Sequence, residues 1–111
     1  MRVNTNIVEN YLQEFPDYDD TLPMIDGFVD SSWHNDVCPS ICEKDNTDED
    51  TCLYIFIDYK NPSLRECVND HRYTLSLGYG TGDYLFSTDN WDEMVGVVKY
   101  HISMRKLENQ S

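Results

Sequence analysis

One histidine and three cysteines, side chains that can bind a metal, fall close together with the spacing His34-x3-Cys38-x3-Cys42-x9-Cys52. An imidazole and three thiolates would complete a tetrahedral zinc site and would stabilise a loop-rich segment. Structural zinc sites, however, usually carry their cysteines as pairs on tight turns, and here Pro39 interrupts the one close pair. We therefore predict free thiols and no cofactor, with a small zinc-stabilised regulatory or interaction domain as the alternative.

The remaining reactive side chains do not form a known catalytic motif. Cys67 precedes His71 by four residues, so a Cys–His pair is conceivable, but a buried thiol is the commoner reason for a cysteine in such a pattern. A calcium loop counted from Asp45 would need glycine at its sixth position and glutamate at its twelfth, where the chain has Asp50 and Phe56. The chain also has no GxSxG, phosphate-binding glycine loop or paired-histidine metalloprotease motif. We expect a protein that is not an enzyme.

The charge is distributed unevenly along the chain. Of the net charge of −13, residues 9–58 contribute fourteen acids against one base, Lys44, whereas residues 59–111 carry seven acids and six bases. Segregated charge of this kind predicts an acidic surface that attracts a basic partner and repels nucleic acid. The partner-binding residues that we predict are Asp17, Asp19, Asp20, Asp26, Asp30, Asp36, Glu43, Asp45, Asp48, Glu49 and Asp50. Tyr18, Trp33 and Tyr54 lie near these acids and are candidates for anchoring contacts.

The elements that must position these acids follow from the hydrophobic pattern. An amphipathic helix begins near Asn4 or Thr5 and ends at Pro16, and a weak strand spans residues 27–33. A long acidic loop covers about 34–51, and the apolar segment 52–59 predicts a central strand.

The second half of the chain predicts a hairpin and a helix. A short helix or turn begins at Pro62, and strands 72–79 and 83–88 are joined by a glycine-containing turn. The last helix has Thr88 or Asp89 as its cap. Its predicted buried stripe comprises Trp91, Met94, Val95, Val98 and Ile102.

Together these elements predict one α+β domain over residues 1–111, with a three- to four-stranded antiparallel sheet flanked by an N-terminal and a C-terminal helix. The composition, 40% hydrophobic and 13% aromatic, argues against disorder. No apolar stretch has the length of a membrane span and no secretory signal is evident, so we expect a cytoplasmic protein without a membrane partner.

In size, charge and the clustering of acids over residues 17–50, the chain resembles the small acidic inhibitors of phages and plasmids. These include DNA-mimicking antirestriction proteins, anti-CRISPR proteins and uracil-glycosylase inhibitors. The resemblance implies a stoichiometric inhibitor, acting in the host cytoplasm, that occupies the basic nucleic-acid-binding surface of a partner such as a CRISPR effector or a restriction enzyme. It carries over no individual residue roles and leaves the oligomeric state open. The six bases of the C-terminal half depart from uniformly acidic mimics and favour a single charged face.

Overall fold

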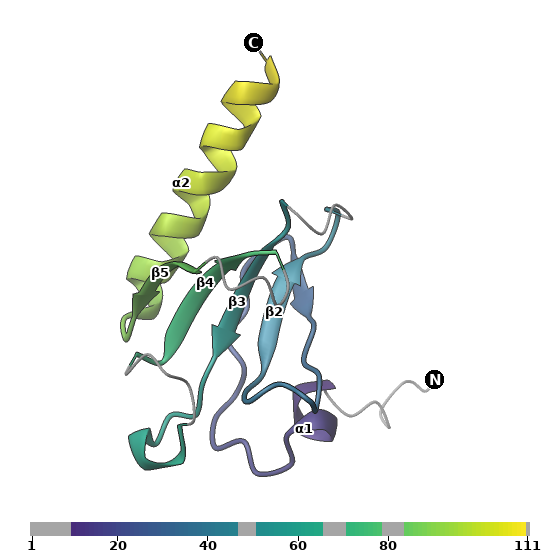
Figure 1. The fold of residues 1–111 in the computed structure, drawn as a ribbon, viewed down its shortest axis with the longest axis vertical. Helices are drawn as coiled ribbons and strands as arrows, with labels where there is room; N and C mark the ends of the chain where they lie inside the picture. The colour runs from purple at the N-terminus through teal and green to yellow at the C-terminus, as the bar shows by residue number, and fades with distance from the viewer. Residues whose placement is uncertain (1–9, 47–50, 66–70, 79–83, 111) are drawn as a thin grey trace.

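The computed structural model describes residues 10–46, 51–65, 71–78 and 84–110. Residues 108–110 are described for their backbone only. The elements within these ranges are α1 (Asn10–Glu14), β1 (Phe28–Asp30), β2 (Ser40–Glu43), β3 (Leu53–Ile57), the 3₁₀ helix η2 (Pro62–Leu64), β4 (Tyr73–Leu77), β5 (Tyr84–Thr88) and α2 (Trp91–Gln110). The strands follow one another in the order β1-β2-β3-β4-β5 and every neighbouring pair is antiparallel (Figure 1). The α+β class with an antiparallel sheet is therefore confirmed.

The central strand β3 shows why the sheet has one fully buried face. Its residues alternate between buried and half-buried, because successive side chains point to opposite sides of a sheet. Ile55 pairs with Ile41 of β2 on one side and with Leu75 of β4 on the other, and all three side chains are 0% exposed. These three isoleucine and leucine side chains form the middle of the core on what we call the inner face.

Two parts of the chain cover the inner face, and both lie behind the sheet in Figure 1. Met94 and Val98 of α2 are fully buried, and Trp91, Val95 and Ile102 pack around them as predicted. The segment between α1 and β1 covers the rest of the face with the buried side chains of Phe15, Tyr18, Leu22 and Ile25.

The helix α2 begins one residue later than the sequence predicts. The side chain of Asn90 accepts a hydrogen bond from the backbone N–H of Glu93 (3.0 Å), so Asn90, and not Thr88 or Asp89, is the N-cap. The Thr88 hydroxyl instead accepts from the backbone N–H of Asn90 (3.1 Å) and stabilises the turn that leads into the helix. Within the described ranges, no helix is long and apolar enough to cross a membrane.

The main difference from the predicted elements is the strand β2, which lies inside the segment predicted to be a loop. It makes the sheet five-stranded and pairs with β1 and β3. The predicted strand 27–33 is shorter, since only Phe28–Asp30 form β1, and the described part of the first helix is the single turn of α1. Several predicted features lie outside the described residues. They are the start of the first helix, the hairpin turn at 79–83, and the residues Asp48, Glu49, Asp50 and Cys67.

Candidate functional site

The structure divides the predicted acidic residues between the two ends of the sheet. Glu43 is the last residue of β2, and Asp26 and Asp45 lie in the turns beside it. The start of β3 lies at the same end of the sheet, which we call the β2–β3 end. Asp17, Asp19 and Asp20 belong to the segment after α1, which reaches the opposite, β3–β4 end, as shown by the contacts of Asp19 with Lys60 and Asn61 (Figure 1). The carboxylates therefore form two groups.

At the β3–β4 end, two of the aspartates hold the fold together. Asp19 accepts hydrogen bonds from the backbone N–H groups of Lys60 and Asn61, both at 2.8 Å. Desolvation would raise the pKa of Asp19, but these donors outweigh it and the pKa is lowered. Asp20 accepts from the backbone N–H of Thr21 (2.8 Å) and from the Arg72 guanidinium (3.1 Å), and together they lower its pKa.

Asp30 also has a structural role, at the junction of β1 and α1. Its carboxylate accepts hydrogen bonds from the backbone N–H of Tyr11 (2.8 Å) and of Ser32 (2.9 Å). The first of these bonds ties the start of the described part of α1 to the end of β1. Asp36 is half-buried in the segment between β1 and β2, where its backbone N–H donates to the carbonyl of Trp33 (2.9 Å).

At the β2–β3 end, Glu43 forms a two-contact ion pair with Arg105 of α2. Both guanidinium nitrogens Nη1 and Nη2 bind the carboxylate, Nη1 to Oε2 at 2.9 Å, and the Glu43 side chain is only 9% exposed. Oε2 also accepts from the backbone N–H of Leu53 (2.9 Å). Desolvation raises the pKa of Glu43, but Arg105 and the Leu53 amide outweigh it and the pKa is lowered.

The neighbours of this ion pair form an open depression of about 590 Å³. Its lining residues are Asp26, Gly27, Phe28, Glu43, Asp45, Asn46, Thr51, Ile102, Arg105 and Lys106. Asp26 and Asp45 are exposed, and because Arg105 neutralises Glu43, the remaining formal charges of the lining are these two aspartates against Lys106. The structure thus brings together three of the predicted residues, Asp26, Glu43 and Asp45, in a depression with a net negative charge.

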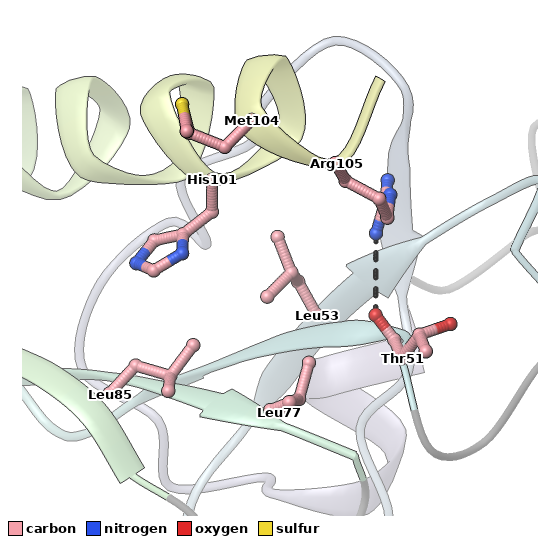
Figure 2. A pocket seen from close by; sticks show the side chains of 7 residues that line it. All are labelled: Thr51, Leu53, Leu77, Leu85, His101, Met104 and Arg105. Carbon is pink, nitrogen blue, oxygen red and sulfur yellow. Dashed lines mark hydrogen bonds between the residues drawn. The ribbon is translucent and has the colours of Figure 1, made fainter. Parts of the chain in front are cut away.

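A second depression lies between α2 and the sheet at the same end. This groove of about 310 Å³ is lined by Thr51, Leu53, Leu77, Leu85, His101, Met104 and Arg105 (Figure 2). Leu53, Leu77 and Leu85 come from three adjacent strands, and His101 and Met104 lie above them on the helix. Arg105 closes one side through a hydrogen bond to the carbonyl of Thr51 (3.3 Å). The groove is mainly apolar and differs in this respect from the acidic depression. Sequence reasoning missed it, because it is formed by residues from four separate elements.

Of the four residues that suggested zinc, Cys42 and Cys52 are neighbours, but the four do not gather into one site. Among the described residues, no group of three or more His, Cys, Asp or Glu side chains is arranged to hold a metal. The His34 ring instead contacts the carboxylate of Glu14 at 2.9 Å, and Cys38 is fully buried. Cys38, Cys42 and Cys52 are all free thiols. Burial and the neighbouring Cys42 raise the pKa of Cys52 to about 11, so this thiol is a poor nucleophile and a poor ligand near neutral pH.

The other reactive and aromatic candidates have different surroundings. His71, the candidate partner of Cys67, has its Nδ1 3.4 Å from the carboxylate of Asp89. Trp33 is 46% exposed, and Tyr54 is half-buried on the outer face of the sheet. Tyr18 is only 7% exposed, so its prediction as a surface anchor was wrong. Its hydroxyl donates to the carbonyls of residues 57 and 58 at the end of β3 (3.2 and 3.1 Å), and burial raises its pKa far above the ordinary value.

All three arginines of the described chain are bound within the molecule. Arg65 donates to the carbonyls of Tyr59 (2.7 Å) and Lys60 (3.0 Å). Arg72 binds the Tyr18 hydroxyl, the Asp20 carboxylate and the carbonyl of residue 58, and Arg105 binds Glu43. Guanidinium groups are the usual ligands of nucleic-acid phosphates, and these three are already occupied by acceptors of the chain itself.

These features define a small α+β protein with an acidic depression at one end of its sheet. No protein-family model, curated protein or solved structure matches the chain.

Proposed function

We propose that this protein is a non-enzymatic inhibitor whose acidic β2–β3 end binds a basic surface on a nucleic-acid-processing protein, for example a CRISPR effector or a restriction enzyme. The observation that carries the proposal is the depression in which Asp26 and Asp45 are exposed, while the three arginines of the described residues bind other groups. In the sequence, Asp48, Glu49 and Asp50 follow shortly after Asp45. A lysine or arginine side chain of a partner would find carboxylate acceptors here.

The charge of the whole molecule supports a basic protein as the partner over nucleic acid. With a net charge of −13 the chain repels phosphates at long range, and a protein that binds DNA needs free Lys and Arg side chains to displace counterions. The three arginines discussed above are bound internally. The same field accelerates the approach of a positively charged surface, as it does in other electrostatically steered complexes.

The contacts in the structure favour fewer binding residues than the eleven acids that the sequence predicts. Asp19, Asp20, Asp30 and Glu43 stabilise the fold through the hydrogen bonds described above. Since a carboxylate that already accepts two or more hydrogen bonds has less capacity for a new cation, these four contribute mainly through their long-range field. We therefore assign direct contacts to Asp26 and Asp45 first.

The experiment is a capture of binding proteins from a lysate of the native host on immobilised protein, washed at low and high salt (about 50 and 500 mM). We expect one major basic protein that is retained at low salt, released at high salt and displaced by an excess of duplex DNA. Recovery of no such protein, or retention that neither salt nor DNA changes, would contradict the proposal. Direct binding of the immobilised protein to labelled duplex DNA would contradict it as well.

A further inference from the structure

The helix α2 has a second apolar stripe besides the one that packs on the sheet. Tyr100, Met104 and Leu107 follow a 4-3 spacing, which places them along one side of a helix, as in the seam of paired helices. Val97 precedes them at the same spacing but is partly buried against the core. Tyr100 is 61% exposed, Met104 40% and Leu107 59%, whereas Met94 and Val98 on the inner side are fully buried. We call Tyr100, Met104 and Leu107 the outer stripe.

One residue of the outer stripe, Met104, lies close to the β5 edge of the sheet. Met104 lines the apolar groove together with Leu85 of β5 (Figure 2). Ile102 and Lys106, on the other side of the helix, line the acidic depression together with Phe28 of β1. The two sides of α2 thus border opposite halves of the sheet, and Met104 lies on the side next to β5.

Among the residues that the structure describes, β5 is an edge strand that lacks the usual sequence features against pairing. It is the last strand in the sheet order, has five residues and contains neither a charged residue nor a proline. The opposite edge, β1, is only three residues long and carries Asp30, two features that discourage pairing with another chain. Tyr84 and Leu85 at the start of β5 are 55% and 39% exposed. An exposed edge strand therefore lies next to an exposed apolar helix stripe.

The distribution of charge indicates which partner fits this surface. Residues 59–111, which include β4, β5 and α2, carry a net charge of −1, whereas residues 9–58, which include the other three strands, carry −13. Two copies that meet at β5 would keep their acidic halves at the two far ends of the assembly, where repulsion is weakest. A two-fold axis would also make the two α2 helices antiparallel, so the acidic first turn of each (Asp92 and Glu93) would point along the basic half of the other.

We propose that a second copy of this chain covers this surface, forming a two-fold symmetric dimer through the β5 edges and the outer stripes of α2. The interface is isologous, because the same strand and the same stripe meet their own copies. The proposal is independent of the function proposed above, since it uses the half of the molecule away from Asp26 and the other carboxylates of the acidic depression.

Sedimentation velocity over a range of protein concentrations tests the proposal. We expect a discrete dimer for the wild type, and a dissociation constant at least about tenfold higher for Tyr100→Glu and for Leu107→Glu, because each change acts twice in a symmetric interface. Met24→Glu and Leu64→Glu are the matched controls, since these side chains are 48% and 47% exposed elsewhere on the surface and the charge change is the same. Both controls should remain dimeric.

Hydrogen exchange provides a second readout that is specific for the strand. The amides of β5 should exchange more slowly at concentrations where the wild type is dimeric than in Leu107→Glu, while circular dichroism shows the same fold for both proteins. A wild type that is monomeric at every concentration overturns the proposal. A dimer that persists in both stripe variants, or one in which β5 exchange is unchanged, overturns it too.

Discussion

The ion pair between Glu43 and Arg105 connects the strand β2 to the C-terminal half of α2, and replacing Arg105 by methionine tests its contribution to stability. Methionine keeps most of the alkyl chain and removes the charge and the donors. The substitution leaves a carboxylate that is 9% exposed with the Leu53 amide (2.9 Å) and the Asn46 amide group (3.4 Å) as its remaining partners.

The magnitude follows from this geometry. Breaking a fully buried ion pair costs about 3–5 kcal/mol, because one charge is left without compensation. Here the Arg105 side chain is 30% exposed and Glu43 keeps two donors, so water and these donors offset part of the loss. We expect Arg105→Met to lower the free energy of unfolding by about 1.5–3 kcal/mol. Lys106→Met, the neighbouring exposed base, should change it by less than about 0.5 kcal/mol.

Urea unfolding followed by tryptophan fluorescence gives these values, and a double-mutant cycle with Glu43→Gln isolates the interaction. The folded-state pKa of Glu43 is lowered from its ordinary value of 4.5, so the stabilisation is complete above pH 4.5 and is lost as the pH falls through the folded-state pKa. The coupling energy should therefore be constant from pH 7 to about 5 and decrease below that range. A coupling energy near zero at pH 7, or one that increases in acid, would refute this reasoning.

Two further predictions concern other contacts. Asp30→Ala removes the acceptor of the Tyr11 and Ser32 amides, so it should destabilise the protein by about 1–3 kcal/mol. It should also accelerate hydrogen exchange at Tyr11 under conditions where the protein stays folded. Unchanged exchange at Tyr11 would show that the bond to Asp30 does not protect this amide. Because the pKa of Cys52 is raised to about 11, its alkylation by iodoacetamide at pH 8 should be roughly a hundredfold slower in the folded protein than in urea, as measured by peptide mass spectrometry. Equal rates in the two states would show that this thiol is not buried.

Much of the fold could be predicted because the signals are local. The segment of β3 is apolar on both faces, and it forms the central strand of the sheet. The stripe of α2 around Met94 and Val98 has the helical period and is buried as expected. The strand β2 had no such signal, because Ile41 is its only strongly apolar side chain and its partners β1 and β3 supply the rest of the burial.

The candidate site was less predictable, because its essential contacts join distant parts of the chain. Glu43 and Arg105 are 62 residues apart, and the sequence does not reveal that Arg105 neutralises this acid. Asp19 and Asp26 both belong to the acidic part of the sequence and cannot be told apart there. In the structure, Asp19 binds backbone amides at the β3–β4 end, whereas Asp26 borders the depression. Charge counts predict that an acidic surface exists, whereas the fold decides which carboxylates belong to it.

The most direct test of the proposed function is the affinity for the captured basic protein, measured by calorimetry for two pairs of variants. Asp26→Asn with Asp45→Asn removes two exposed charges from the depression, and Asp17→Asn with Asp92→Asn removes two exposed charges elsewhere on the described surface. We expect the first pair to weaken binding about tenfold or more and to reduce its salt dependence, while the second pair should change the affinity by about threefold or less. Equal losses for the two pairs, or no loss for the first, would contradict the assignment of binding to the β2–β3 end.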